Sequence, residues 1–297
     1  MTDSLRLRCP AKINLGLSAG SANEGRLHPL VSWMVQVSLF DELTIARRSD
    51  GDHTTTLQRT WAGDAPVAGC VDWSQEQDLV YRAHQSMEQA AGRCLPVTAR
   101  LAKRIPSGSG LGGGSSDAAS MVLGLQRLFG LDVDGEVLLE LAARLGSDVP
   151  FFLGPPSAIV QQPDHDSSPL DLAGPLHLAL ILPPIRCPTA EVFGHFDRLV
   201  PGGRVDRHRV VRSSRRCDDP PLLNDCLAND LDVAAFAARP ELRELHRRTQ
   251  QAAGRPVHLT GSGSAMFMVC RDAVEAGRTA ELIGEQVGTP AVAVHTL

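Results

Sequence analysis

The chain has 297 residues, enough for one large or two ordinary domains with their own hydrophobic cores. Hydrophobic residues make up 43% of it and charged residues 21%, proportions that are typical of soluble globular proteins and exclude a disordered chain. The formal net charge of −5 excludes a general attraction to nucleic acid or to an anionic membrane, so we expect neither as a partner.

Alternating or β-branched patterns predict strands in the first third of the chain, at Leu5–Arg8, Ile13–Leu17, Val31–Ala46 and Val97–Ala102. We expect a turn within CPAKIN between the first two strands. The third segment is expected to be a strand pair, broken near Phe40–Glu42. Helical spacing of apolar residues predicts a helix over Asp78–Ala91.

A glycine-rich run, PSGSGLGGGSS, occupies Pro106–Ser116. The apolar residues behind it recur with a helical period, so a helix is predicted there, with Ser116 as candidate N-cap and Gly130 as its C-terminal stop. A second helix over Gly135–Leu145 is expected to end at Gly146.

The stretch at residues 161–174 is polar with Pro and Asp, and we interpret it as a link between domains. The elements expected beyond it are a buried strand in Leu176–Pro184, helices at Thr189–Val200 and Pro240–Gly254, and a strand, turn and strand over Val257–Cys270. The arginine-rich residues 203–216 are interpreted as a solvated loop or helix face. Strands and helices alternate without long repeats, which predicts an α/β or α+β fold.

The cysteine pattern and the length of the apolar runs bear on the cellular compartment of the protein. The seven cysteines are scattered, odd in number and without a C-x-x-C pair, which argues against a disulfide framework. The N-terminal stretch lacks the apolar core of a signal peptide, and the longest apolar runs are too short to span a bilayer. We therefore expect a cytoplasmic protein.

The glycine run has four interpretations. Gly108, Gly110 and Gly113 satisfy G-x-G-x-x-G, but a Rossmann site needs a strand directly before the first glycine, and KRIPS intervenes. A Walker A loop fails because no Gly-Lys-Ser/Thr follows. A flexible loop without a ligand remains open. A polyphosphate held by main-chain N–H groups explains both the glycines and the helix behind them.

PSGSGLGGGSSDAA resembles the P-x-x-x-G-L-G-G/S-S-S/A motif of the GHMP kinases, which include galactokinase and the homoserine, mevalonate and phosphomevalonate kinases. CPAKINLGL (Cys9–Leu17) resembles their N-terminal motif and LTGSGSAMF (Leu259–Phe267) their C-terminal glycine motif, in the expected order. PAKIN, GLGGGSSDAA, LGSDVPFFL, PTAEVF and NDL are most similar to the 4-diphosphocytidyl-2-C-methyl-D-erythritol kinase family.

This resemblance implies an α+β fold with two domains. Residues 1–163 would form an ATP-binding domain like domain 2 of ribosomal protein S5, and residues 164–297 a ferredoxin-like domain. It also implies phosphorylation of the 2-hydroxyl of 4-diphosphocytidyl-2-C-methyl-D-erythritol by ATP and Mg²⁺, in non-mevalonate isoprenoid precursor biosynthesis. The Mg²⁺ ligands are not assigned, and a monomer or a homodimer is expected.

The resemblance also implies the catalytic pair. Asp148 in SDVP would act as base toward the acceptor hydroxyl, and Lys12 in AKIN would keep that carboxylate ionised. An Asp in a turn and an ordinary surface lysine are the alternatives. Only Lys12 and Lys103 among the 29 basic residues are lysines, which hints at sites that need a compact ammonium.

The resemblance places ATP on the glycine run, at Pro106, Gly108, Gly110, Leu111, Gly112, Gly113, Gly114, Ser115 and Ser116. Either serine could instead cap the helix, and Asp117 is interpreted as structural, favouring the helix dipole.

The implied contacts of the acceptor are Asn14, His28, Thr189 and Phe193. Asn14 lies on the same strand face as Lys12 and would bind the diol, and Thr189 would contact the methylerythritol. The family's D-G-Y-H segment corresponds to GRLH here, so His28 would read cytosine, while Leu27 replaces a stacking Tyr. Phe193 would be the other stacking aromatic, and a solvent-facing His28 is the alternative.

Three rival functions remain open from sequence. One is another GHMP kinase, acting on homoserine, mevalonate or a sugar alcohol. The second is a GHMP-fold sensor that binds its ligand without transfer, which the presence of both Lys12 and Asp148 disfavours. The third is a nicotinamide-dependent oxidoreductase.

Overall fold

The computed structural model describes residues 3–22, 27–48, 54–163 and 166–297. The chain forms two compact units, each of them discontinuous in sequence. The first unit contains Met1–Ala11, Leu39–Ile105 and Gly112–Pro155, and the second contains Lys12–Ser38, Pro106–Leu111 and Pro156–Leu297. The predicted domain boundary at residues 163 and 164 divides the chain differently; it borders residues 164–165, which lie outside the described residues, and stays a prediction.

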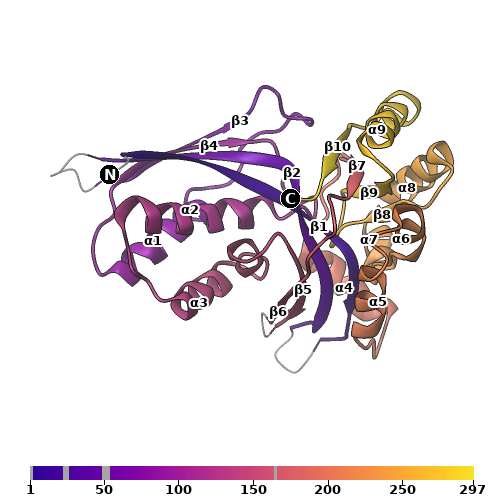
Figure 1. Cartoon of the computed structure of the whole chain (residues 1–297), viewed down its shortest axis with the longest axis horizontal. Coiled ribbons are helices and arrows are strands. Elements are labelled where there is room, and N and C mark those ends of the chain that lie inside the picture. Colours follow the sequence, from indigo (N-terminus) through magenta and orange to yellow (C-terminus); the bar gives the residue numbers. More distant parts are fainter. Residues whose placement is uncertain (1–2, 23–26, 49–53, 164–165) are drawn as a thin grey trace. The chain divides into compact units, whose positions relative to one another are not determined.

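Helices and sheets occur together, as expected for an α+β fold (Figure 1). The strands are β1 (Ser4–Ala19), β2 (Leu30–Arg47), β3 (Thr56–Trp61), β4 (Val97–Lys103), β5 (Ser157–Gln162), β6 (Ser167–Pro169), β7 (His177–Ile181), β8 (His258–Leu259), β9 (Met266–Cys270) and β10 (Ala291–His295). The helices are α1 (Leu79–Ala91), α2 (Gly113–Phe129), α3 (Gly135–Leu145), the 3-10 turn η1 (Pro150–Leu153), α4 (Thr189–Leu199), α5 (Arg207–Ser214), α6 (Pro220–Cys226), α7 (Asp232–Ala238), α8 (Pro240–Ala253) and α9 (Ala273–Val287).

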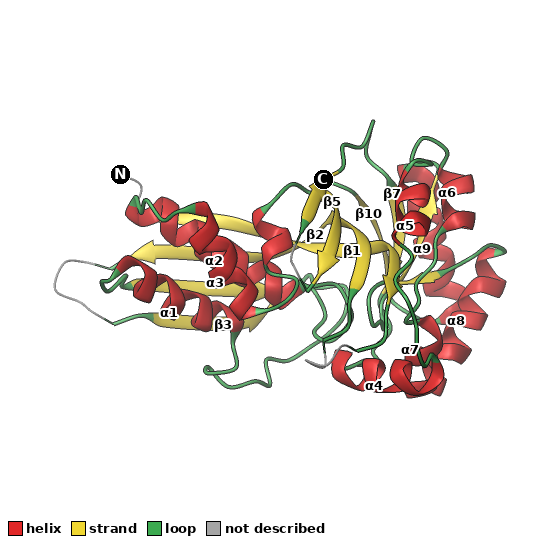
Figure 2. Cartoon of the chain, turned by 90° about the horizontal axis from the view of Figure 1, so that it is seen from below, coloured by secondary structure: helices red, strands yellow, loops and turns green. Residues whose placement is uncertain are grey.

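In the first unit, three helices cover one face of a sheet. The C-terminal half of β2 pairs with β4 in antiparallel register, and β3 pairs with β4 in parallel through the crossover helix α1. Figures 1 and 2 show α1, α2 and α3 on the same side of these strands. Gly124 brings α2 close to the sheet, because a Cβ there would lie 2.7 Å from the side chains of Leu7 and Ile45.

A buried cluster of charges joins these layers. The Lys103 ammonium contacts Asp41 of β2 and lies 2.6 Å from Asp117 in the first turns of α2. All three side chains are almost completely buried, with exposed fractions of 3% or less. Asp41 also accepts hydrogen bonds from the main-chain N–H groups of Arg104 and Ile105, where the glycine run begins. The cluster therefore fixes the end of β4 and the start of α2 to β2.

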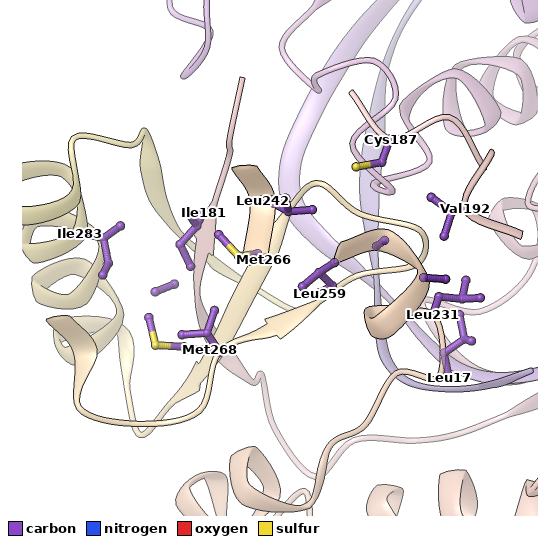
Figure 3. Packing of buried hydrophobic residues seen from close by; sticks show 14 of the residues in the cluster. Leu17, Ile181, Cys187, Val192, Leu231, Leu242, Leu259, Met266, Met268 and Ile283 are labelled. Atoms are coloured by element: carbon purple, nitrogen blue, oxygen red, sulfur yellow. The ribbon is translucent and has the colours of Figure 1, made fainter. Parts of the chain in front are cut away.

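In the second unit, β10, β7, β9 and β8 form an antiparallel sheet in that order. Alternate residues of β9 face one hydrophobic cluster, because successive strand side chains point to opposite faces. Figure 3 shows Met266 and Met268 of β9 in this cluster with Ile181 of β7, Leu242 of α8 and Ile283 of α9. The N-terminal half of β2 belongs to this unit and pairs with β5.

Two predicted breaks in strands are wrong. β1 continues from Ser4 to Ala19 through CPAKIN, and β2 continues through Phe40–Glu42. In both places a polar residue is buried with a partner distant in sequence: Asn14 contacts Thr260, and Asp41 contacts Lys103. A polar group that finds such a partner does not have to leave the strand.

The predicted ends of helices agree with the structure more often than the predicted breaks in strands. Gly130 ends α2 in the left-handed region with φ of 59°, and Gly146 follows α3, both as predicted. The helix predicted over Asp78–Ala91 is α1, and Asp78 is its N-cap, a role that was not predicted. The predicted N-cap Ser116 is wrong, because α2 begins one turn earlier, at Gly113.

The arginine-rich stretch contains α5, so the helix alternative holds there. Several elements were not predicted from sequence: β3, β5, β6, α6, α7, α9 and β10. The stretch interpreted as a link, residues 161–174, contains the end of β5 and all of β6. Among the described residues, no helix combines the length and apolar character needed to cross a membrane.

The charge cluster makes stability depend on pH. Burial raises the pKa of Asp117 to about 8, although Lys103 opposes the shift. An unfolded Asp releases its proton near pH 4, at about 3.9. The folded protein therefore holds a proton that the unfolded chain has lost, and stability falls as pH rises through this window.

We expect the Asp117→Asn variant to lose the pH dependence of stability that comes from the Asp117 proton. Between pH 6 and pH 9, the variant's free energy of unfolding, measured in urea, should therefore fall less than that of the unmodified protein. The difference should be on the order of 1–3 kcal/mol. Asp64→Asn is the matched control, because Asp64 is exposed and its pKa is lowered, which confines its effect to acid. Equal pH dependence in the Asp117 variant and the unmodified protein would show that Asp117 is ionised throughout.

Candidate active site

Main-chain hydrogen bonds within the second unit join three motifs: AKIN, the glycine run and the TGSGS turn. The Lys12 N–H donates to the carbonyl of Leu111 at 2.9 Å, which ties AKIN to the glycine run. The Ala265 N–H donates to the carbonyl of Ser109 at 2.9 Å, which ties the C-terminal TGSGS turn to the same run. Segments about 100 and 150 residues apart thus meet through their backbones.

The amide side chain of Asn14 lies at the centre of a buried polar network. Its Oδ1 accepts from the Lys12 ammonium at 2.5 Å and from the Thr260 hydroxyl at 3.3 Å. Its Nδ2 donates to Ser32 Oγ at 2.8 Å, and Ser32 donates onward to the carbonyl of Gly16. The Asn14 main-chain N–H donates to Thr260 Oγ1 at 2.9 Å. Lys12 and Asn14 therefore share a face of β1, as predicted.

This network changes what Asn14 offers a substrate. An amide oxygen has two lone pairs and an amide nitrogen two N–H groups. Both lone pairs of Oδ1 and one N–H have partners, so one N–H remains uncommitted among the described residues. Asn14 is better suited to positioning the Lys12 ammonium than to binding a diol through several hydrogen bonds.

Bare backbone lies directly against the Lys12 ammonium. Gly261 has a left-handed φ of +58°, and a Cβ there would lie 3.3 Å from Lys12 Nζ and 3.1 Å from Asn14 Oδ1. Asn229, from the NDL motif, holds this turn by donating to the carbonyl of Gly261 at 2.8 Å and to that of Leu259 at 3.2 Å. The TGSGS turn therefore supports the AKIN motif.

The glycine run has a repeating conformation. Gly108, Gly110 and Gly112 have φ values of 68°, 79° and 69°, so every second residue is left-handed. Alternation of this kind turns successive N–H groups toward one side and creates a concavity for anions. A side chain at Gly110 would collide with the carbonyl of Thr260. The Leu111 side chain is buried, so its predicted contact with ATP would involve its main chain.

The first unit contains the start of α2. Among the described residues, no side chain caps this helix at Gly112, which leaves main-chain donors of its first turn for water or a ligand. Ser116 is completely buried, and its Oγ has no partner within the described residues. Ser115 Oγ lies 4.0 Å from the position of a Cβ on Gly146. The turn that carries Asp148 thus lies beside the beginning of α2, and this end of the helix suits a phosphate.

Asp148 occupies the turn between α3 and η1, which is closed by a hydrogen bond from the Val149 N–H to the carbonyl of Gly146 at 3.1 Å. The side chain is half-buried. Asp148 belongs to the first unit and Lys12 to the second, so their action as a pair stays a prediction.

The residues expected at the cytosine come together in the second unit. The His28 ring stacks on Phe193 with ring centroids 4.3 Å apart, and its Nε2 lies 2.8 Å from Asp197 Oδ1. His28 thus covers part of the ring on which a base was expected to stack. Thr189 begins α4, and its hydroxyl lies 3.2 Å from that of Ser262. The first two residues of GRLH, 25 and 26, lie outside the described residues.

Sequence reasoning missed several of these groups. The scarcity of lysine pointed to Lys103, but nothing in the sequence indicated its partner Asp41. Ser32 and Asp197 gave no signal of their own, because a lone Ser or Asp in a strand or helix is ordinary. Asn229 lies in the NDL motif, but nothing in the sequence indicated its contact with the TGSGS turn.

Comparisons with known proteins agree with the motifs. A family model described as GHMP kinases N terminal domain matches residues 78–154. A 4-diphosphocytidyl-2-C-methyl-D-erythritol kinase of a Nocardioides species is 34% identical over 270 residues, 90% of this chain and 89% of the relative. One from Thermus thermophilus is 35% identical over 274 residues, 92% and 90% of the two chains.

A crystal structure of 4-(cytidine 5'-diphospho)-2C-methyl-D-erythritol kinase superimposes with a TM-score of 0.77 at 33% identity. The match covers 99% of this chain and 100% of the solved one. The resemblance seen in the motifs, and the α+β GHMP kinase fold expected from it, are therefore confirmed.

The Asn14 network predicts energetic coupling between residues 246 positions apart. In a double-mutant cycle of Asn14→Ala and Thr260→Val, we expect an interaction term of about 0.5–3 kcal/mol in the free energy of unfolding, measured in urea. Valine keeps the shape of threonine and removes only the hydroxyl.

The control cycle combines Asn14→Ala with Thr249→Val, whose hydroxyl bonds to Leu245 within α8. These two substitutions share no partner, so they should add to within about 0.5 kcal/mol. Additive values for the Asn14 and Thr260 pair as well would mean that the network does not join the two motifs.

Proposed function

Because the chain belongs to the 4-diphosphocytidyl-2-C-methyl-D-erythritol kinase family of GHMP kinases, we propose that it transfers the γ-phosphoryl group of ATP to the 2-hydroxyl of that substrate. The reaction is a step of non-mevalonate isoprenoid precursor biosynthesis. The structural observation that supports this most is the buried Lys12 ammonium, held by Asn14 against the bare backbone of Gly261. That arrangement holds a buried ammonium beside the main chain of Gly261.

The ATP phosphates are assigned to the glycine run and to the start of α2. The left-handed glycines and the uncapped helix end fit a polyphosphate, since both provide main-chain N–H donors. Within the described residues, no group of three or more His, Cys, Asp or Glu is arranged to hold a metal ion. This fits Mg²⁺ that arrives with ATP, because such an ion commonly uses one or two carboxylates besides phosphate oxygens. Bound Mg²⁺ would neutralise phosphate charge.

Lys12 and Asp148 are assigned to the acceptor hydroxyl. Phosphoryl transfer requires mainly positioning and charge stabilisation, and the hydroxyl must also lose its proton. We assign the removal of that proton to the Asp148 carboxylate. The Lys12 ammonium would stabilise the negative charge that develops on the oxygen. Asn14, with Thr260 and Ser32 behind it, keeps the ammonium in one position.

The cytidine end of the substrate is assigned to His28 and Phe193, and the methylerythritol end to Thr189. His28 and Phe193 already form one stacked pair. Leu27 provides no aromatic face for the base, so we expect stacking to contribute less here than hydrogen bonding. A cytoplasmic location, and a monomer or homodimer without nucleic-acid or membrane partners, stay predictions from composition and resemblance.

An acceptor panel tests the proposed function. With ATP and Mg²⁺, we expect coupled ADP release with 4-diphosphocytidyl-2-C-methyl-D-erythritol and none above background with homoserine or mevalonate. Turnover of one of the other alcohols alone would assign the chain to a different GHMP kinase activity. Tight binding of the cytidine substrate without ADP release would favour the sensor.

The role of Asp148 is tested by Asp148→Asn. We expect kcat to fall by about 10²–10⁴-fold, the usual contribution of a general base, while calorimetry finds ATP affinity unchanged. The control is Asp132→Asn, which makes the same change at an exposed position of the same unit. If Asp148→Asn folds and keeps nearly full kcat, another group removes the proton.

A further inference from the structure

We infer that Asp197 fixes the tautomer of His28 and so makes the base site select an exocyclic amino group over an exocyclic carbonyl. The ligand class is a nucleotide base whose edge carries an exocyclic amine, as cytosine does and uracil does not. For the identity of the ligand, this inference rests on the proposed function. Asp197 acts here as a positioning residue, through His28.

The geometry holds His28 in two ways. Phe193 and Asp197 are four residues apart on α4 and therefore lie on one face of that helix. Phe193 stacks on the imidazole at a centroid separation of 4.3 Å with an interplanar angle of 30°. Asp197 bonds to Nε2 at 2.8 Å. Phe196 meets the same ring edge-on at 6.3 Å. The imidazole is thus fixed both on its face and at one nitrogen.

The bond to Asp197 determines which nitrogen carries the proton. An ionised carboxylate has only acceptor atoms, so the hydrogen bond requires a proton on Nε2. In a neutral imidazole the other nitrogen, Nδ1, then has a lone pair and can only accept. Within the described residues, no partner of Nδ1 is found, so this acceptor is available to a ligand.

An acceptor at Nδ1 distinguishes the two pyrimidines. Cytosine has an amino group at position 4, which donates to Nδ1, whereas uracil has a carbonyl there, whose lone pairs repel it. Such a bond lies in the imidazole plane, so the base would lie in the layer that His28 already forms over Phe193. A mismatched polar pair of this kind lowers kcat/KM by roughly tenfold to a hundredfold.

Without Asp197, the site no longer distinguishes cytosine from uracil through His28. A neutral imidazole released from the carboxylate exchanges between its two tautomers, and one of them presents a donor at Nδ1. In that tautomer, Nδ1–H can donate to the uracil carbonyl but cannot accept from the cytosine amino group. The Asp197 side chain is 42% exposed, so its removal leaves no large cavity in the hydrophobic core. Removal therefore changes the proton position without a large cost in stability.

The experiment compares Asp197→Ala, Asp197→Asn and the control Arg198→Ala, an exposed neighbour on α4 outside the base site. The first readout is the ¹⁵N chemical shifts of the His28 ring in the ligand-free protein at pH 8, where imidazoles are mostly neutral. His28→Gln assigns the signals. We expect a protonated Nε2 and a bare Nδ1 in the unmodified and Arg198→Ala proteins, and averaged shifts in Asp197→Ala.

The second readout is the ratio of kcat/KM for the cytidine substrate to that for its uridine analogue. We expect a ratio of roughly ten to a hundred in the unmodified and control proteins. Asp197→Ala should reduce the ratio severalfold or more. Asp197→Asn retains an oxygen acceptor for Nε2–H and should keep more of the preference than Asp197→Ala.

The two readouts separate the possible failures. If the unmodified protein does not turn over the cytidine substrate, the proposed function and the base selectivity both fall, while the ¹⁵N shifts still decide the tautomer. If turnover is normal and Asp197→Ala changes neither the shifts nor the ratio, Asp197 is only a surface partner of His28. Altered shifts with an unaltered ratio would show that His28 does not select the base.

Discussion

The Asn14 amide is the interaction on which the second unit's motifs depend. It joins an ammonium from AKIN and a hydroxyl from TGSGS, and it reaches Ser32 on the neighbouring strand. All of these groups are buried, so each one that lost its partner would bear the cost of an unsatisfied polar atom. Glycine suits the turn at Gly261, because its φ of +58° is left-handed and a Cβ there would lie only 3.3 Å from the ammonium that Asn14 positions. Fold and site thus share the same hydrogen bonds.

The two buried lysines, one in each unit, have different partners. The Lys12 ammonium bonds to the neutral amide oxygen of Asn14. Lys103 lies between two carboxylates, and its charge is neutralised internally. The arrangement around Lys103 suits a purely architectural residue. The flat, wider guanidinium of arginine would not replace a compact ammonium in either place.

Sequence alone predicted the features that are set by local chemistry. Gly130 after α2 and Gly146 after α3 act over three or four residues, so their signals are complete in the sequence. The breaks predicted in β1 and β2 failed because distant partners keep Asn14 and Asp41 inside their strands. The pairing of His28 with Asp197 was equally hidden, since it joins a loop to a helix 169 residues away.

The burial of both lysines has a practical consequence for chemical labelling. Lys12 and Lys103 are 3% and 2% exposed, and they are the chain's complete set of lysines. An acylating reagent that targets primary amines can therefore reach a lysine only after local or global opening of the unit that contains it. Since each unit contains one lysine, peptide mapping of the acylated sites would time the opening of the two units separately, with no engineered probe.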